Sequence, residues 1–177
     1  MPSREELLPI LTAAARTPDH GKLEPWRFAV LTRPALERIA QAVPEAGARL
    51  GEGPERIGKM VSQFADAHLA VAVIASPKPS EKIPEIEQVL SAGAVCLALL
   101  NAALAAGWGA NGLTGWAVHD RQFATGQLGL ARTHLHRYRH EQRLAHHAGA
   151  VRGLDGLAQV PLPELEQGAI GVDHQIQ

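Results

Sequence analysis

The side chains best suited to chemistry lie together in the stretch Arg16-Thr-Pro-Asp-His-Gly-Lys-Leu-Glu-Pro-Trp-Arg-Phe28. It contains a cation, an acid and a titratable imidazole, and a proline near each end prevents a helix from continuing through it. Trp26 and Phe28 then lead into a short apolar run that predicts a buried strand. A rigid turn that presents polar groups between a helix end and a core strand is a common way to build a small-molecule site.

A second candidate for ligand binding is Gly107-Trp-Gly-Ala-Asn-Gly112, which satisfies the pattern G-x-G-x-x-G. A dinucleotide fingerprint must follow a strand and open a helix, with an acidic residue about 20 positions further on. Here the pattern follows a predicted helix, and Asp120 comes too soon. We therefore predict a helix that ends at Gly107, followed by a tight strand and turn in which glycine permits close backbone approach to a ligand.

Other polar clusters carry weaker signals. Five of the nine histidines lie in 133–147, and His134, His136 and His140 have a spacing at which imidazoles can converge on zinc. A solvated arginine- and histidine-rich segment is the favoured alternative, because no carboxylate or thiolate completes a familiar site. The single cysteine, Cys96, predicts a buried core thiol rather than a nucleophile. The sequence contains no recognisable catalytic triad, metal quartet or phosphate-binding loop, and we assign no catalytic or metal-binding residue.

The elements that position these residues follow from capping and periodicity. Ser3 and Glu6 form a capping-box pattern, which predicts a helix that begins near Arg4, bends at Pro9 and stops before Pro18. We predict strands at 26–31 and 69–75, the second at the centre of the sheet, and helices at 34–43, 54–67 and 85–106. Loops are predicted at 45–54 and 76–84. Asp120 is predicted to cap a short helix that ends near 129–130.

The helix predicted at 85–106 is apolar almost all round, and its middle, Ser91-Ala-Gly-Ala94, consists of small residues. Such a helix is buried, either inside one chain or in a subunit interface. The pattern alone leaves both alternatives open.

Length and composition restrict the class of protein. A chain of 177 residues is long enough for one core and short for two domains. Its net charge of −1 argues against a nucleic-acid or membrane-surface partner recruited by charge. The sequence shows no run of 18 uninterrupted apolar residues and no signal-peptide pattern at its start, so we expect a cytoplasmic protein.

Two motifs resemble the nitroreductase superfamily, in particular its minimal single-domain members. The pattern R-x-P-D-H-x-x-x-x-P-W-R-F at 16–28 resembles the flavin-facing loop of that family, and the block from Lys82 to Trp116 resembles its E-Q-x-x-S-A-G-A helix and the turn that follows. The resemblance extends from Ser3 to about Leu130. It implies an α+β fold with a central, mostly antiparallel sheet flanked by helices, in an intertwined homodimer whose interface holds FMN.

The resemblance also implies roles for particular residues. Arg16 and His20 match residues that contact FMN, as do Gly112, Leu113 and Thr114. Without the resemblance, Arg16 would be an exposed cation at a helix C-terminus and His20 a residue that only hydrogen-bonds its turn. Family members usually carry a bulky residue at the position of Gly112, so its pocket is expected to be wider here or its flavin less firmly held. We expect Asp19 and Lys22 to be solvent-exposed loop charges rather than catalytic groups.

The implied activity is hydride transfer from NAD(P)H through flavin N5 to a nitro compound, a quinone or a similar small-molecule acceptor. Because the cofactor carries the chemistry in such enzymes, the lack of a catalytic triad is no objection. The alternative is a degenerate, non-catalytic family member that dimerises but binds flavin poorly.

Both ends of the chain depart from the resemblance. Residues 1–131 match the family domain but lack its N-terminal phosphate-binding segment, so we expect the native protein to begin about 20 residues earlier, enough for a helix and a phosphate-binding turn. Residues 132–177 form an atypical tail, whose first part, 132–140, has no strand periodicity and is rich in arginine and histidine. A one-base shift of permitted codons for 132–140 yields Glu-Arg-Ile-Cys-Ile-Gly-Ile-Gly-Thr, which resembles the family's next strand, so we expect a frame-shifted tail and a sheet that lacks a strand. A divergent tail is the alternative.

Overall fold

A computed structural model of the chain describes residues 2–128, 148–150 and 158–159. Its described strands form one antiparallel sheet in the order β3-β4-β2-β1-β5. β1 and β2 pair along their whole length, from Trp26 opposite Ala75 to Thr32 opposite Leu69. The strands are β1 (Trp26–Thr32), β2 (Leu69–Ala75), β3 (Asn111–Leu113), β4 (Ala148–Ala150) and β5 (Ala158–Gln159).

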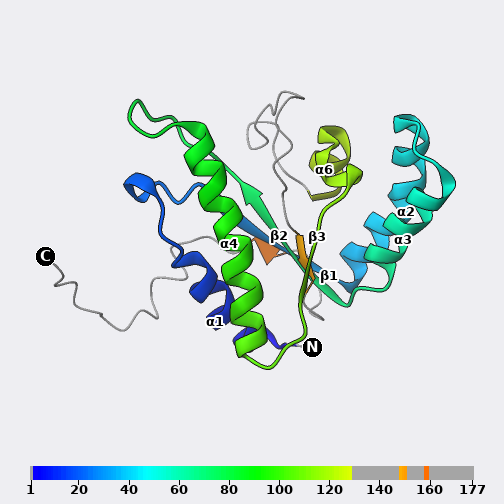
Figure 1. Cartoon of the computed structure of the whole chain (residues 1–177). Coiled ribbons are helices and arrows are strands. Elements are labelled where there is room, and N and C mark those ends of the chain that lie inside the picture. The colour runs from blue at the N-terminus through cyan, green and yellow to red at the C-terminus, as the bar shows by residue number, and fades with distance from the viewer. Residues whose placement is uncertain (1, 129–147, 151–157, 160–177) are drawn as a thin grey trace, which may run out of the picture.

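Helices lie on both faces of the sheet, which gives the predicted α+β architecture (Figure 1). α1 and α4 cover one face, and the pair α2 and α3 lies with α5 and α6 on the other. The helices are α1 (Arg4–Ala15), the short 3-10 helix η1 (His20–Lys22), α2 (Arg33–Leu50), α3 (Pro54–Ala65), α4 (Glu85–Ala105), α5 (Trp116–His119) and α6 (Arg121–Leu128).

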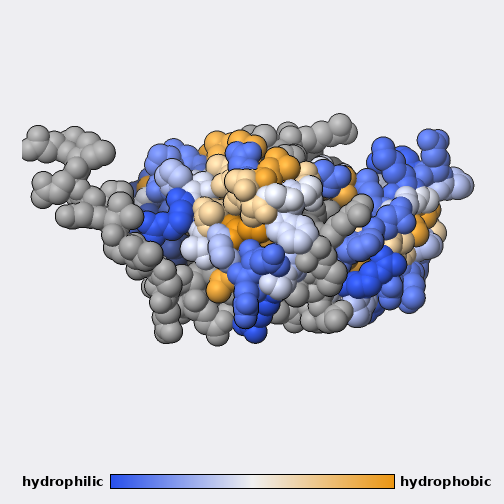
Figure 2. All heavy atoms as spheres, turned by 90° about the horizontal axis from the view of Figure 1, so that it is seen from below, coloured by the Kyte–Doolittle hydropathy of each residue, from blue (hydrophilic) through white to orange (hydrophobic). Residues whose placement is uncertain are grey.

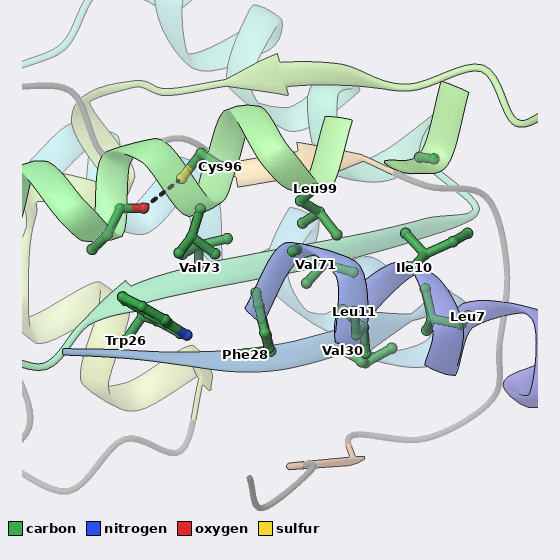
Figure 3. Close-up of a cluster of buried hydrophobic side chains, with 14 of the residues drawn as sticks. Leu7, Ile10, Leu11, Trp26, Phe28, Val30, Val71, Val73, Cys96 and Leu99 are labelled. Carbon is green, nitrogen blue, oxygen red and sulfur yellow. Dashed lines mark hydrogen bonds between the residues drawn. The ribbon is translucent and has the colours of Figure 1, made fainter. Parts of the chain in front are cut away.

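Alternation along the two central strands divides the core into two layers, since successive side chains of a strand point to opposite faces. Trp26, Phe28 and Val30 pack with α1 and α4, as Figure 3 shows, whereas Ala29 and Leu31 pack with α2 and α3. β2 is apolar at every position because both of its faces are covered.

The capping box predicted at the N-terminus is confirmed. Ser3 Oγ accepts a hydrogen bond from the Glu6 backbone N–H at 3.2 Å, and Glu6 Oε2 accepts one from the Ser3 N–H at 2.7 Å. Asp120 also caps its helix, because its Oδ2 accepts from the Phe123 N–H at 3.0 Å. Both caps satisfy backbone donors that a helix leaves unpaired in its first turn.

One element prediction is wrong. The segment 45–54 was expected to be a loop, but α2 continues through Pro44 to Leu50, and only 51–53 form the turn. Ala46 and Gly47 are buried and extend the apolar face of α2 by another turn. Packing against α3 therefore outweighs the backbone hydrogen bond that Pro44 removes. Gly51, with φ +73°, ends the helix in the left-handed conformation.

Two short strands lie within 132–177, the segment expected to be an atypical tail. β4 lies between β2 and β3, and β5 pairs with β1. The histidine-rich segment 133–147 and its candidate zinc ligands lie outside the described residues.

α4 has the length and apolar character of a membrane-spanning helix. A core helix of a water-soluble domain has the same composition, and α4 packs along the sheet and α1 through Ala92, Val95, Cys96 and Leu99. Cys96 is buried, as predicted, and its Sγ donates to the Ala92 carbonyl oxygen at 3.5 Å (Figure 3).

Candidate functional site

The turn after α1 holds two of the predicted site residues at the surface. Arg16 is the C-cap of α1, with φ −80° and ψ 3°, and its backbone N–H donates to the Thr12 carbonyl oxygen at 3.2 Å. His20 opens η1, and both side chains are exposed. The helix end and the proline that follows thus present an arginine and a histidine on the same turn.

The side chain of Asp19 stabilises this turn by hydrogen bonds to its backbone. Its Oδ2 accepts hydrogen bonds from the backbone N–H groups of Leu23 at 2.6 Å and Glu24 at 2.9 Å. These bonds support a backbone with positive φ at Gly21, Lys22 and Glu24, a conformation that costs free energy at the two non-glycine residues. The expectation that Asp19 is only a solvent-exposed loop charge is wrong, because its carboxylate is half-buried and bound, whereas Lys22 is exposed as expected.

His20 also faces the start of α4. Its Nε2 lies 3.9 Å from Oε2 of Glu87, with 67% of the His20 side chain and 41% of the Glu87 side chain exposed. At this exposure the ion pair is weak, and its main consequence is positional. The contact places η1 beside the first turn of α4.

The other predicted site residues lie at one edge of the sheet. Among the described strands, β3 lies at one end of the sheet order. Gly112 and Thr114 are exposed, and Leu113 is half-buried. Thr114 lies just beyond Leu113, the last residue of β3 in the ladder with β4. Gly107 ends the preceding helix region with φ +83°, so the predicted helix stop and glycine-rich strand are both observed.

The inner side of this edge borders a small apolar cavity of about 30 Å³. Met60 and Phe64 of α3 form one wall, and Leu113, Thr114 and Gly115 form another. A Cβ placed on Gly115 would lie 2.2 Å from Cε of Met60, so the segment after β3 rests directly on α3. This contact could not be predicted from the sequence, because nothing in the spacing of α3 relates Met60 to residue 115.

The two groups of predicted residues do not meet within one chain. No hydrogen bond or ion pair among the described residues joins Arg16 or His20 to 112–114. In Figure 1, η1 and β3 appear on opposite sides of α4.

The outer face of α4 exposes large apolar side chains to solvent. Four large apolar side chains are more than a third exposed: Ile86 (39%), Leu90 (54%), Leu97 (60%) and Leu104 (55%). They recur at spacings of four, seven and seven residues. Half-buried Gly93 and Leu100 complete an unbroken alternation of three and four residues along the same line. We call these six residues the α4 seam. In Figure 2, apolar side chains gather near the top of the view, at the horizontal position that α4 has in Figure 1.

One polar group near the start of β1 was missed by sequence reasoning. Arg27 is half-buried and donates from Nε to Ser76 Oγ at 3.0 Å, while its Nη2 is buried with no hydrogen-bond partner among the described residues. Burial lowers the pKa of the Arg27 guanidinium below its ordinary value. Across the described residues, no group of three histidine, cysteine or acidic side chains is placed to bind a metal ion.

Comparison with known proteins matches residues 1–136 to the model of the Nitroreductase family. YdjA of Escherichia coli K12, named a putative NAD(P)H nitroreductase, is 33% identical over 108 residues, which cover 61% of this chain and 59% of YdjA. The match thus spans about three-fifths of that relative's length.

Two solved structures share the fold. A nitroreductase with bound FMN from Bacteroides fragilis has a TM-score of 0.63 at 16% identity, over 100% of this chain and 85% of that one. The FMN-dependent nitroreductase NfnB of Mycobacterium smegmatis, in complex with NADPH, has a TM-score of 0.60 at 15% identity, over 87% and 79%. Identities this low establish the fold alone.

Proposed function

Since the chain belongs to the nitroreductase family, we propose that it is an FMN-dependent oxidoreductase that uses NAD(P)H to reduce a nitro compound, a quinone or a similar small acceptor. Support comes from YdjA, whose name is that of a putative NAD(P)H nitroreductase, and from neighbours of the same fold whose structures hold FMN or NADPH. The single observation that carries the proposal is the family match over residues 1–136.

The residues present suit a flavin mononucleotide. Arg16 and His20 are exposed donors on one rigid turn, and an arginine can bind the oxygens of a phosphate or a flavin carbonyl. Gly112 and Thr114 are exposed at a sheet edge, and a glycine leaves room for a flat ring to approach the backbone. Bound FMN would supply the hydride chemistry, by accepting a hydride from NAD(P)H and delivering it to the acceptor.

The role of the protein is then to bind and orient. Arg16 and His20 would hold FMN by hydrogen bonds and charge, and Oε2 of Glu87 lies 3.9 Å from Nε2 of His20. Backbone N–H groups near Leu113 and Thr114 would stabilise negative charge on a flavin bound beside them. No side chain of this chain needs to act as a nucleophile.

The separation of the two groups of residues supports a homodimeric site. Because 16–20 and 112–114 lie apart within one chain, a ligand that uses both groups is best accommodated between two copies. The α4 seam gives such a dimer its contact surface. Alternating spacings of three and four residues are typical of helices that pack side by side at a shallow angle.

Flavin retention tests the proposal most directly. The purified full chain is passed through gel filtration, its visible absorption is recorded, and NAD(P)H oxidation is followed with and without a nitroaromatic or quinone acceptor. A flavin band that co-elutes with the protein, together with acceptor-dependent NAD(P)H oxidation, supports the enzyme. A colourless protein that excess FMN does not reconstitute contradicts it and favours the degenerate, non-catalytic family member.

A further inference from the structure

The segment that follows β3 is weakly fixed by the sheet itself. β3 is three residues long, lies at one end of the sheet order and, among the described strands, pairs with β4 alone. Leu113 is its last paired residue, so Thr114 and Gly115 have no place in the ladder. The position of these two residues therefore depends on contacts outside the ladder.

Those contacts come from α2 and α3, and glycines make both of them possible. Gly115 is extended, with φ −172°, so its backbone conformation does not require glycine. What it provides is space, because a Cβ there would lie 2.2 Å from Cε and 3.7 Å from Sδ of Met60. The next residue, Trp116, packs on Gly47 of α2, where a Cβ would lie 3.3 Å from Cη2 of the indole.

Met60 is the part of this support nearest to the predicted flavin contacts. Its side chain is 5% exposed, and it belongs to the core layer between the sheet and α2. The cavity of about 30 Å³ lies beside it and is also lined by Leu113, Thr114 and Gly115. Truncation of the Met60 side chain would enlarge this cavity next to 113–115. The segment could then move toward α3.

We propose that Met60 is a positioning residue, whose thioether supports Gly115 and so holds Leu113 and Thr114 at the position from which they contact the flavin. This inference rests on the proposed function. Met60 lies on the core side of the segment and touches no cofactor. It acts through the backbone of 113–115, so its loss changes the affinity and the electronic environment of the flavin as well as the stability of the fold.

The test compares Met60→Ala and Met60→Leu with Ile39→Ala, a truncation of another buried side chain of the same core layer that does not line the cavity. The readouts are the FMN dissociation constant from flavin fluorescence, the visible absorption and reduction potential of the bound flavin, and the melting temperature of the apoprotein. We expect Met60→Ala to raise the dissociation constant by about tenfold and to shift the flavin spectrum and potential. Met60→Leu should restore both, because leucine has a similar volume.

Ile39→Ala should lower the melting temperature and leave the flavin properties at their wild-type values. The inference is overturned if Met60→Ala lowers stability but binds FMN with wild-type affinity, spectrum and potential. If the wild-type chain itself binds no FMN, the proposed function fails, and the inference falls with it.

A double-mutant cycle provides an independent readout. Gly115→Ala places a methyl group against Met60 and should also weaken FMN binding. If both residues act through one contact, the effects of Gly115→Ala and Met60→Ala on FMN affinity are not additive, because the alanine methyl group occupies space that the shortened side chain vacates. Additive effects would overturn the inference.

Discussion

His20 Nε2 lies 3.9 Å from Oε2 of Glu87, which places the turn after the first helix against the first turn of α4. Two segments separated by more than 60 residues of chain thus share one surface. The contact links the loop of the first sequence motif to the helix of the second.

Arg16→Ala and His20→Ala are each expected to weaken FMN retention and leave the fold intact. Loss of a charge-assisted hydrogen bond costs about 1.5–3 kcal/mol, which corresponds to a tenfold or greater rise in the dissociation constant. Flavin fluorescence titration measures the affinity, and far-ultraviolet circular dichroism checks the fold. Lys22→Ala, which removes another exposed cation of the same turn, is the control. Wild-type affinity in both variants would contradict the assignment of this turn to the flavin site.

Leu97→Arg is expected to dissociate the proposed dimer. Leu97 is 60% exposed and lies in the middle of the α4 seam. An arginine there would be buried without a partner in a helix-to-helix contact, which should raise the dimer dissociation constant by about 100-fold or more. Analytical ultracentrifugation measures the change.

Leu50→Arg is the matched control, because Leu50 is 42% exposed but lies at the end of α2, away from the seam. Its sedimentation should match that of the wild type. A wild-type chain that sediments as a monomer, or a Leu97→Arg variant that remains a dimer, would show that the seam is not the interface.

Two glycine-to-alanine substitutions in neighbouring helices should change stability in opposite directions. Gly58 lies in α3 with open space around its Cβ position, so alanine should stabilise the fold by about 0.5–1 kcal/mol through helix propensity. Gly47 lies in α2, and a Cβ there would approach Cγ1 of Ile57 to 2.5 Å. Gly47→Ala should therefore destabilise by about 1–3 kcal/mol, because overpacking outweighs the gain in propensity. Urea denaturation measures both, and equal shifts would refute the close packing of α2 on α3.

The capping box makes part of the stability dependent on pH. The hydrogen bonds from Ser3 lower the pKa of Glu6 below its ordinary value of 4.5. A carboxyl group whose pKa is depressed by folding stabilises the native state above its unfolded pKa, and this contribution is lost as the pH falls through the folded pKa. Glu6→Gln should thus destabilise the chain near neutral pH. The difference from wild type should shrink as the pH drops below 4.5. Urea midpoints across this range check the trend, and a constant difference would contradict it.

Much of the fold follows from local signals. Ser3 and Glu6 marked the start of α1, and the apolar run from Leu69 to Ala75 predicted the central strand, since strand-length apolar runs lie where both faces of a sheet are covered. α2 was predicted to end too early, because Pro44 and Gly47 are poor helix formers by themselves. The close approach of α3, which explains Gly47, is a tertiary contact that no local pattern contains.

The candidate site was predicted less completely. Arg16 and His20 were predicted to share one turn, and they do. The carboxylate of Asp19 was misassigned because its hydrogen bonds to Leu23 and Glu24 depend on the path of the turn. The contact between Met60 and Gly115 joins residues far apart in the chain and has no signature in either segment. The predictions of a missing N-terminal segment and a frame-shifted tail are not tested by the described residues and stay predictions.

The arrangement of the core also bears on the order in which the protein can fold during synthesis. Every buried side chain described in the layer beneath α1 and α4 lies between Leu7 and Ala103, and the two longest strands are both complete by Ala75. Half of the core can therefore close as soon as α4 has left the ribosome, before the chain that forms β4 and β5 has been translated. β4 and β5 then add to a sheet that has already formed. Changes in the sequence of these C-terminal segments would leave the core layer beneath α1 and α4 in place.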